Sequence, residues 1–340
     1  MSAAVSDATH REVLPEEDGL RLDRWLRSRF PRLSFGRLQK LLRTGQIRVD
    51  GRRATPGTRL APGQRVRIPP PLLAEEEGRR RMPPSGRDVR FLRRRIVYAD
   101  EDVIVLDKPA GLAVQGGPKT PRHLDAMLDA LAEGGERPRL VHRLDRDTAG
   151  LLLLARNRRA ARELMHAFRR HRVRKLYWAV VLGAPRGLEG SIDLPLGKAG
   201  PRGEERMTPE APGARKAVTR YRVLARAGKV GAWLALEPLT GRTHQLRAHC
   251  AAMGWPILGD VKYGGERAKP PQAPGGLMLQ AVEIEFPHPR TGRAVRVRAQ
   301  PAAHLRAGLA WLGFAAGDPV PGKWLEDSAS ERTGGGGHRG

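Results

Sequence analysis

The sequence predicts an α+β protein made of two folded units, and three observations support this prediction. Its 340 residues exceed one typical domain and fall short of three. Apolar residues at helical spacing alternate with short strand-like runs along most of the chain. Residues 19–70 hold fourteen Lys or Arg and only two acids, a local excess of twelve positive charges. We therefore expect a small basic unit followed by a larger one.

The total charge points to the class of partner. The chain carries 62 Lys and Arg against 36 Asp and Glu, a net charge of +26. A protein rarely keeps such self-repulsion without a polyanionic partner, so nucleic acid is expected. The longest strongly apolar run, residues 151–155, is far shorter than the roughly 20 residues that a membrane helix needs. This excludes a membrane-spanning protein.

Cysteine content and the first residues indicate the compartment. The one cysteine, Cys250, excludes an internal disulfide framework and any metal cluster that needs two thiolates. Residues 1–18 are mixed and acidic and have no cationic start followed by an apolar block, so we expect an N-terminal tail without a secretory signal. The sequence predicts a cytoplasmic protein.

Residues 19–70 predict two short helices. Apolar residues recur on one face over 22–26, and Pro31 prevents this first helix from continuing. Ser34 can cap the second helix, and Gly45 suits the left-handed position just past its end.

A small sheet is expected to follow these helices. Ile47 and Val49 alternate with polar residues up to the hairpin turn Asp50-Gly51, and the alternation resumes at Val66. The basic residues predicted to face outward and bind RNA are Arg37, Lys40, Arg43, Arg48, Arg52 and Arg53.

Residues 71–95 read as a linker, because prolines, an acidic triplet and arginine clusters occur there with little apolar periodicity. Residues 96–305 predict the larger domain. Its expected strands are 103–106, 150–155, 177–182, 219–224, 233–236 and 282–286, and its expected helices cover 158–170 and the stretch after Thr243. We expect an exposed loop at 198–214 and a disordered tail at 315–340.

Polar residues 140–150 stand directly before the buried strand 150–155. Their side chains, including Asp145 and Asp147, are therefore expected at the edge of a sheet, where a rigid backbone suits a functional site. A purely structural alternative is a polar turn in which both carboxylates satisfy loop amides and pair with neighbouring arginines.

A second polar cluster covers residues 239–250. If the stretch after Thr243 is helical, Arg247 lies within about one turn of His244. A zinc site at His244 and His249 is poorly supported, because the spacing is not the four-residue step that places two ligands on one helical face. The other alternative is an amphipathic helix start with solvated arginines.

Five motifs occur in one linked order along the chain. They are Asp107-Lys108-Pro109-x-Gly111, His142-Arg143-Leu144-Asp145-x-x-Thr148-x-Gly150, Lys175-x-Tyr177-x-Ala179, Gly241-Arg242-Thr243-His244-Gln245-Leu246-Arg247 and Pro256-Ile257-x-Gly259-Asp260-x-x-Tyr263-Gly264. This set resembles the RNA pseudouridine synthases of the RluA/RluC group. The basic unit resembles the alpha-L RNA-binding motif of a small-subunit ribosomal protein. Together the similarities span residues 20–301.

The resemblance implies a fold, a reaction and four site residues. The implied catalytic domain is a mixed, mainly antiparallel sheet flanked by helices, which isomerises uridines in large-subunit (23S) ribosomal RNA after base flipping. Asp145 matches the family's essential aspartate, and Arg247 matches the basic residue that pairs with it. Tyr177 matches the tyrosine that packs on the uracil, and Arg143 matches the arginine that fills the space of the extruded base.

The same resemblance implies no cofactor and no metal, and ribosomal RNA as the partner. The sequence shows no coiled-coil heptads and no long apolar edge, so we expect a monomer. Two residues depart from the family pattern: Ala149 stands where serine is common, and Gln280 stands where histidine is frequent. Neither position is assigned the chemical step, so the departures bear on target choice. The rivals are a non-catalytic RNA-binding protein that kept the fold and an RNA hydrolase. The first could have lost Asp145, Tyr177 or Arg247, and the second lacks a set of groups that would activate water.

Overall fold

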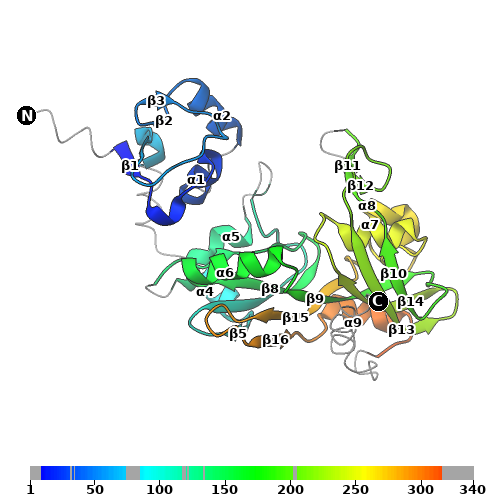
Figure 1. Cartoon of the computed structure of the whole chain (residues 1–340). Coiled ribbons are helices and arrows are strands. Elements are labelled where there is room, and N and C mark those ends of the chain that lie inside the picture. The colour runs from blue at the N-terminus through cyan, green and yellow to red at the C-terminus, as the bar shows by residue number, and fades with distance from the viewer. Residues whose placement is uncertain are drawn as a thin grey trace, which may run out of the picture. The chain divides into compact units, whose positions relative to one another are not determined.

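The computed structural model describes residues 9–30, 33, 35–73, 85–116, 120, 122–132, 135–201 and 205–315. Several predicted features lie outside them: Pro31, Ser34, the acidic triplet and all but the first residue of the C-terminal tail. The chain divides into two compact units, residues 1–86 with 116–121 and residues 87–115 with 122–340 (Figure 1). In the described part of the chain, no helix is both long and apolar enough to cross a membrane.

The first unit is a small sheet with two helices. Its elements are β1 (His10–Glu12), η2 (Pro15–Glu17), α1 (Leu22–Arg29), α2 (Phe35–Arg43), β2 (Arg48–Val49), β3 (Arg52–Arg53) and β4 (Arg65–Arg67). The strand order is β1-β4-β2-β3. Asp50 and Gly51, with φ of 48° and 73°, form the predicted hairpin turn, and Gly45 has the predicted positive φ of 70°. The two helices and the hairpin are thus confirmed.

The unit extends beyond the predicted limits of 19–70 at both ends. Strand β1 pairs with β4, and Val13 is fully buried, so part of the expected N-terminal tail belongs to the fold. Trp25 Nε1 donates a 2.7 Å hydrogen bond to Glu17, which ties this segment to α1. Leu72 and Leu73 are buried in the same core. These two ends were not predicted because each contributes only one or two buried apolar residues to the core.

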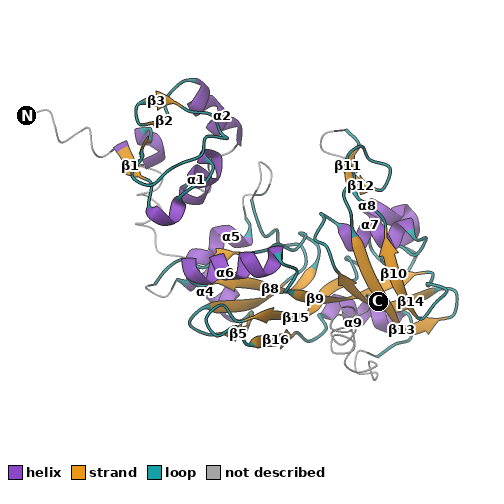
Figure 2. Cartoon of the chain, in the orientation of Figure 1, coloured by secondary structure: helices purple, strands orange, loops and turns teal. Residues whose placement is uncertain are grey.

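The second unit contains one large sheet with helices packed against it (Figure 2). Its elements are α4 (Gly86–Arg93), β5 (Ile96–Ala99), β6 (Val103–Lys108), α5 (Leu124–Met127), η3 (Leu128–Leu131), β7 (Arg139–Leu140), β8 (Ala149–Ala155), α6 (Arg158–Arg169), β9 (Arg174–Leu182), β10 (Glu189–Asp193), β11 (Gly197–Ala199), β12 (Arg206–Thr208), β13 (Val218–Ala227), β14 (Gly231–Pro238), α7 (Gln245–Ala252), α8 (Val261–Gly264), η4 (Gly265–Ala268), β15 (Leu279–Pro287), β16 (Ala294–Arg298) and α9 (Ala303–Trp311).

The sheet has ten strands in the main order β10-β13-β14-β9-β15-β8-β6-β5, with β16 paired to β15 and β7 paired to β8. Among these pairs only β8 and β15 run parallel. This confirms the expected mixed, mainly antiparallel sheet, and each predicted strand of the larger domain falls within an observed one.

The apolar run of β8 is continuous because both faces of the strand are covered. Leu151 and Leu153 pack into the core beneath α6, whereas Leu152 and Leu154 enter the core on the opposite face, which also contains Leu92 of α4. Successive side chains of a strand point to opposite faces, so a strand covered on both sides carries no polar alternation.

Three expectations for this unit are wrong in part. Residues 86–93, expected in a linker, form α4, whose Leu92 is fully buried. The domain continues past residue 305, because α9 runs to residue 311 and buries Leu309 in the main core. The expected loop at 198–214 includes most of the antiparallel hairpin β11–β12. In residues 86–93 and 198–214, charged, Gly or Pro residues outnumber the few apolar residues.

A close crossing of β8 and β15 fixes the edge from which the 140–150 segment emerges. Gly150 pairs with Ala281 at a φ of 104°, and a Cβ on Gly150 would lie 2.1 Å from the carbonyl oxygen of Ala281. Glycine is therefore required there. Next to this pair, Ala149 of β8 pairs with Gln280 of β15, and these are the two residues that depart from the family pattern. The Gln280 amide is satisfied by backbone before α9, since it donates to Gln300 O at 2.9 Å.

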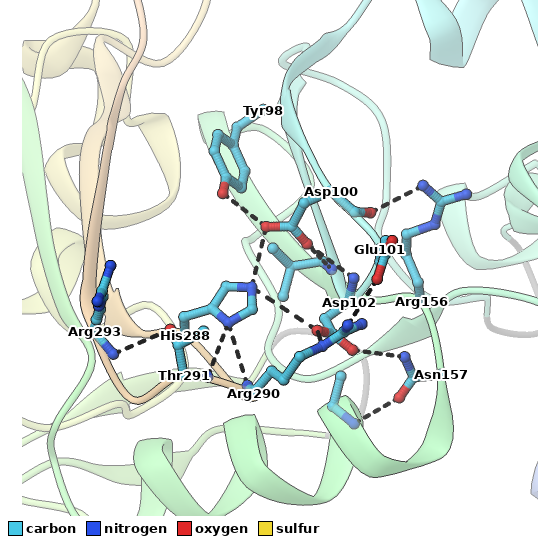
Figure 3. A network of polar contacts seen from close by, with 12 residues as sticks. Tyr98, Asp100, Glu101, Asp102, Arg156, Asn157, His288, Arg290, Thr291 and Arg293 are labelled. Carbon is cyan, nitrogen blue, oxygen red and sulfur yellow. Dashed lines mark hydrogen bonds and ion pairs between the residues drawn. The ribbon is translucent and has the colours of Figure 1, made fainter.

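A polar network joins the turn between β5 and β6 to the turn between β15 and β16 (Figure 3). Buried Asp102 accepts a 2.7 Å hydrogen bond from Arg290 Nε, and this bond is the main cause of the lowered pKa of Asp102. Tyr98 donates to Asp100 at 2.7 Å, and His288 Nε2 lies 3.2 Å from the same carboxylate. These residues do not line the pocket described next.

Candidate active site

A pocket of about 120 Å³ lies where the 140–150 segment, strand β9 and the start of helix α7 meet. Its lining residues are Arg143, Leu144, Asp145, Thr148, Lys175, Tyr177, Pro238, Thr240, Gly241, Arg242, Thr243, His244, Gln245, Leu246, Arg247 and Leu279. The structure therefore brings together four residues singled out from the sequence, Asp145, Tyr177, Arg247 and Arg143. The six basic residues predicted to bind RNA belong to the first unit.

A buried lysine holds the backbone beside Asp145. Lys108, fully buried at the end of β6, donates from Nζ to the carbonyl oxygens of Pro109, Leu112 and Arg146 at 2.8, 2.9 and 3.0 Å. An ammonium group has three donors, and all three are used. Burial lowers the pKa of Lys108 to about 8, against the opposing charges of Asp147 and Asp145. Lys108 thus anchors the backbone of the loop that carries Asp145.

His142 has a structural role. Its Nε2 accepts a 2.8 Å hydrogen bond from the backbone amide of Leu153, and its ring stacks on Phe168 of α6 at 4.9 Å between centroids. Burial, helped by the charge of Lys175, lowers the pKa of His142 to about 3, so the ring is neutral. These contacts fasten the segment that carries Asp145 to both β8 and α6.

The Asp145 carboxylate does not serve as a turn cap in the described contacts. The backbone carbonyl of Asp145 accepts from the Thr148 amide at 3.3 Å, but no loop amide donates to the side chain among the hydrogen bonds of the described residues. The ion contact of this carboxylate is a 3.9 Å approach to His244 Nε2. The polar-turn alternative therefore describes the backbone of this segment. It does not describe the Asp145 side chain, which lines the pocket.

Tyr177 forms a rigid wall of the pocket. It lies in the middle of the sheet on β9, paired with Leu236 of β14 and Ala281 of β15, and is 7% exposed. Burial first, and the charge of Asp145 second, raise the pKa of Tyr177, so the phenol stays protonated. A neutral aromatic ring with little freedom to move suits stacking against a flat ligand.

Arg247 was expected to pair with Asp145, but the carboxylate that it pairs with is Asp260. Arg247 donates from Nε and Nη2 to the two oxygens of Asp260, at 2.8 and 2.7 Å, and both side chains are buried. This bidentate geometry is the strongest that a guanidinium forms with a carboxylate. Asp260 caps α8, which packs against α7, so it reaches the guanidinium from a neighbouring element. Arg247 still lines the pocket. Against the effect of burial, its bonds to Asp260 and, more weakly, the charge of Asp145 raise the pKa of Arg247.

Helix α7 is held by two further buried polar residues. Gln245 accepts from Thr240 Oγ1 at 2.7 Å and donates to Val218 O at 2.9 Å. His249 places Nδ1 2.9 Å from Thr219 Oγ1 and Nε2 3.0 Å from a backbone carbonyl. Both ring nitrogens of His249 therefore have hydrogen-bond partners within the fold.

Sequence reasoning did not assign the roles of Lys108, Asp260 or Lys175, although all three stand in the quoted motifs. A lysine that ends an apolar strand is one signal of a buried ammonium, since Lys is otherwise rarely fully buried. For Asp260 no local signal exists, because its partner lies thirteen residues earlier on another helix.

Lys175 supports a prediction about pH. This partly buried lysine lines the pocket, and burial lowers its pKa to about 8. In the unfolded chain its pKa is near 10.5, so the native state loses the proton first and the unfolded state binds more protons between pH 8 and 10.5. The charged lysine therefore destabilises the fold below pH 8. Lys175→Met is expected to raise the free energy of unfolding by about 1–2 kcal/mol at pH 7, after allowance for solvent screening.

The measurement is urea unfolding at pH 7 and pH 10. The advantage of Lys175→Met over the unmodified chain should shrink at pH 10, where the lysine is neutral in most native molecules. Lys229→Met, at an exposed position, is the control and should change stability little at either pH. An equal effect of Lys175→Met at both pH values would contradict the assignment.

The basic residues of the first unit divide into two groups. Arg37, Lys40, Arg43, Arg52 and Arg53 are exposed. Arg48 is partly buried and donates to the carbonyl oxygens of Gly45 and Gly51, each at 3.1 Å. Its guanidinium therefore braces the hairpin, and its role in RNA binding stays a prediction.

Comparisons with known proteins show which family the chain is similar to. A family model described as RNA pseudouridylate synthase matches residues 102–252, and an S4 domain model matches residues 20–66. The chain is 35% identical over 298 residues to ribosomal large subunit pseudouridine synthase C of Vibrio cholerae, covering 86% of this chain and 92% of that protein. It is 34% identical over 304 residues to an uncharacterized RNA pseudouridine synthase of Synechocystis sp., covering 86% and 89%.

The solved structure of human RNA pseudouridylate synthase domain containing 4 is also similar. The match has a TM-score of 0.55 at 26% identity and covers 66% of this chain and 95% of the human chain.

Proposed function

Because this chain belongs to the RNA pseudouridylate synthase family, we propose that it converts specific uridines of large-subunit ribosomal RNA to pseudouridine, with Asp145 as the catalytic carboxylate. The family makes it an isomerase that acts on RNA. The observation that carries the finer proposal is the shared pocket, in which Asp145 and Tyr177 line one small cavity. The choice of large-subunit RNA rests on relatives such as the Vibrio cholerae enzyme.

The reaction requires few groups. The C1′–N1 bond of uridine breaks, the uracil turns within the pocket, and a C5–C1′ bond forms, while C5 loses a proton and N1 gains one. No oxidation state changes overall. The Asp145 carboxylate acts either by attack at C1′ or by taking the C2′ proton to give a glycal. Either route requires the ionised carboxylate.

The target base must leave the RNA stack to enter this pocket, at a cost of a few kcal/mol. Tyr177 offers a flat, immobile face for the flipped uracil. Arg143 is exposed and lines the pocket, which supports the proposal that it fills the space that the base leaves in the RNA.

The S4 unit is proposed to bind RNA through the exposed cations of α2. Changing Arg37, Lys40 and Arg43 together to Gln is expected to weaken RNA binding roughly tenfold at moderate salt. The slope of log Kd against log[salt] should fall by about two to three. kcat at saturating RNA should stay unchanged, because the pocket lies in the other unit. Binding measured at several salt concentrations, together with single-turnover kinetics, checks this.

A charge-matched control removes three exposed cations of the second unit, Lys229, Arg293 and Arg306. If both triple variants bound RNA equally weakly, net charge rather than the S4 unit would control affinity. If the α2 variant lost turnover on saturating RNA, the unit would have a role in the chemical step.

The function is tested with purified protein and unmodified ribosomal RNA of both subunits. Mapping of pseudouridines after incubation is expected to find a small number of sites in large-subunit RNA and none in small-subunit RNA. Binding of RNA without any new pseudouridine would favour the rival, a non-catalytic RNA-binding protein. Modification of small-subunit RNA alone would overturn the substrate choice. The monomeric state and cytoplasmic location remain predictions that sedimentation and fractionation can check.

A further inference from the structure

His244, which lines the pocket, has an unusual backbone conformation. Its φ of 51° and ψ of 22° lie in the left-handed region, which Gly adopts freely and which costs other residues free energy, although Asn, Asp and His occur there more often than most. His244 occupies the N-cap position of α7, yet its side chain makes no capping hydrogen bond to the helix. A strained residue that does not serve the helix is a candidate for a role in the site.

The imidazole of His244 bridges Asp145 and a tyrosine. Its Nδ1 lies 2.9 Å from Tyr263 Oη, and its Nε2 lies 3.9 Å from Asp145 Oδ1. The rings of His244 and Tyr263 meet edge to face, 5.6 Å apart and at 86°. Tyr263 Oη also accepts a 3.1 Å hydrogen bond from the amide of Met207, in β12. The hairpin β11–β12 thereby joins the network around the catalytic aspartate.

These contacts select one tautomer of the histidine. Because Tyr263 Oη accepts from Met207, its own hydrogen is available to the unprotonated Nδ1 of His244. Burial lowers the pKa of His244 despite the opposing charge of Asp145, so the ring is neutral at pH 7. A neutral ring that accepts at Nδ1 carries its proton on Nε2, the atom that faces Asp145.

We propose that His244 is a positioning residue for the isomerisation: its Nε2–H orients Asp145 through Oδ1, and Tyr263 fixes the tautomer that allows this. The proposal rests on the proposed function of the pocket. The other carboxylate oxygen is then directed at the ribose. The distance of 3.9 Å is long for a hydrogen bond, and such bonds commonly tighten when the substrate binds. Asp145 thus receives from His244 the orientation that Arg247 does not give it.

The first test is spectroscopic and independent of activity. In the full-length protein labelled with ¹⁵N in its histidine rings, the His244 signals should show a protonated Nε2 and an unprotonated Nδ1. Tyr263→Phe should mix the two tautomers. The control Tyr98→Phe removes a hydroxyl that donates to Asp100 outside the pocket, and it should leave the tautomer unchanged. A protonated Nδ1 in the unmodified protein would overturn the proposal.

The second test is kinetic. His244→Asn suits the left-handed backbone but is too short to reach Asp145, so it should fold normally and lose kcat about 30- to 100-fold with KM changed less than threefold. His244→Gln, which restores a donor near the position of Nε2, should regain most of that loss. Tyr263→Phe should lower kcat about tenfold, and Tyr98→Phe should not lower it.

The outcomes separate this proposal from the function itself. If His244→Asn and Tyr263→Phe kept full kcat while Asp145→Asn was inactive, the positioning role would be wrong and the proposed function would stand. If the unmodified protein formed no pseudouridine, the function would fail, and the ¹⁵N spectra would still decide whether Tyr263 sets the tautomer.

Discussion

Asp145→Asn is expected to lower kcat by about four orders of magnitude, which corresponds to roughly 5.5 kcal/mol of lost transition-state stabilisation. Asparagine has nearly the same shape as aspartate, but its amide is neutral and is neither a nucleophile nor a base at this site. Lys108 and His142 hold the surrounding loop through backbone atoms, so the fold of the loop should survive. Folding and RNA affinity should therefore change little.

The rate is measured as tritium released from C5 of labelled uridine in ribosomal RNA, since C5 must lose its hydrogen when the C5–C1′ bond forms. The matched control is Asp147→Asn, two residues along the same loop, where the carboxylate is exposed and lies 3.9 Å from Arg146. It should retain activity within a few-fold. If Asp145→Asn kept more than a tenth of the rate, another group would carry the chemical step.

The same loop shows what local sequence could predict. Strand β8 and helix α6 follow from apolar runs and helical spacing alone, because each buries its apolar residues in the period of its own backbone. The position of Asp145 at the pocket follows from its place before β8. Such inferences need only neighbours in the chain, and they were confirmed.

Pairings between distant segments could not be predicted in this way. The parallel contact of Gly150 with Ala281 joins residues 131 positions apart, and only the folded chain shows why glycine is needed there. The helix α4 was missed for a similar reason, since Leu92 is a single fully buried leucine within an arginine-rich segment. Segments with few apolar residues acquire their structure from the surface on which they pack.

The candidate site was predictable in composition and only partly in arrangement. The motifs at 142–150 and 241–247 do line one pocket, as the resemblance implied. The resemblance also implied that Arg247 clamps Asp145, and here the structure gives Arg247 to Asp260. The choice between two carboxylates depends on burial and on helix packing, neither of which the spacing of residues reveals.

The buried pair of Arg247 and Asp260 should have the second large effect. Asp260→Asn deprives the buried guanidinium of its bidentate carboxylate, so the free energy of unfolding is expected to fall by about 3–5 kcal/mol. Asp145 is the carboxylate in this pocket whose charge also acts on Arg247. The released guanidinium should therefore turn toward Asp145, compete with His244 for it, and lower kcat.

Urea unfolding of Asp260→Asn and of Glu189→Gln separates burial from charge alone. Glu189 pairs with Arg222 at the surface, where its side chain is 66% exposed, so the same loss of a carboxylate should cost less than about 1 kcal/mol. A third variant, Arg247→Met with Asp260→Leu, removes both charges and should regain most of the stability without regaining turnover. A loss in Asp260→Asn no larger than in Glu189→Gln would mean that the Arg247 charge is compensated elsewhere, and that the bidentate pair does not hold α7 against α8.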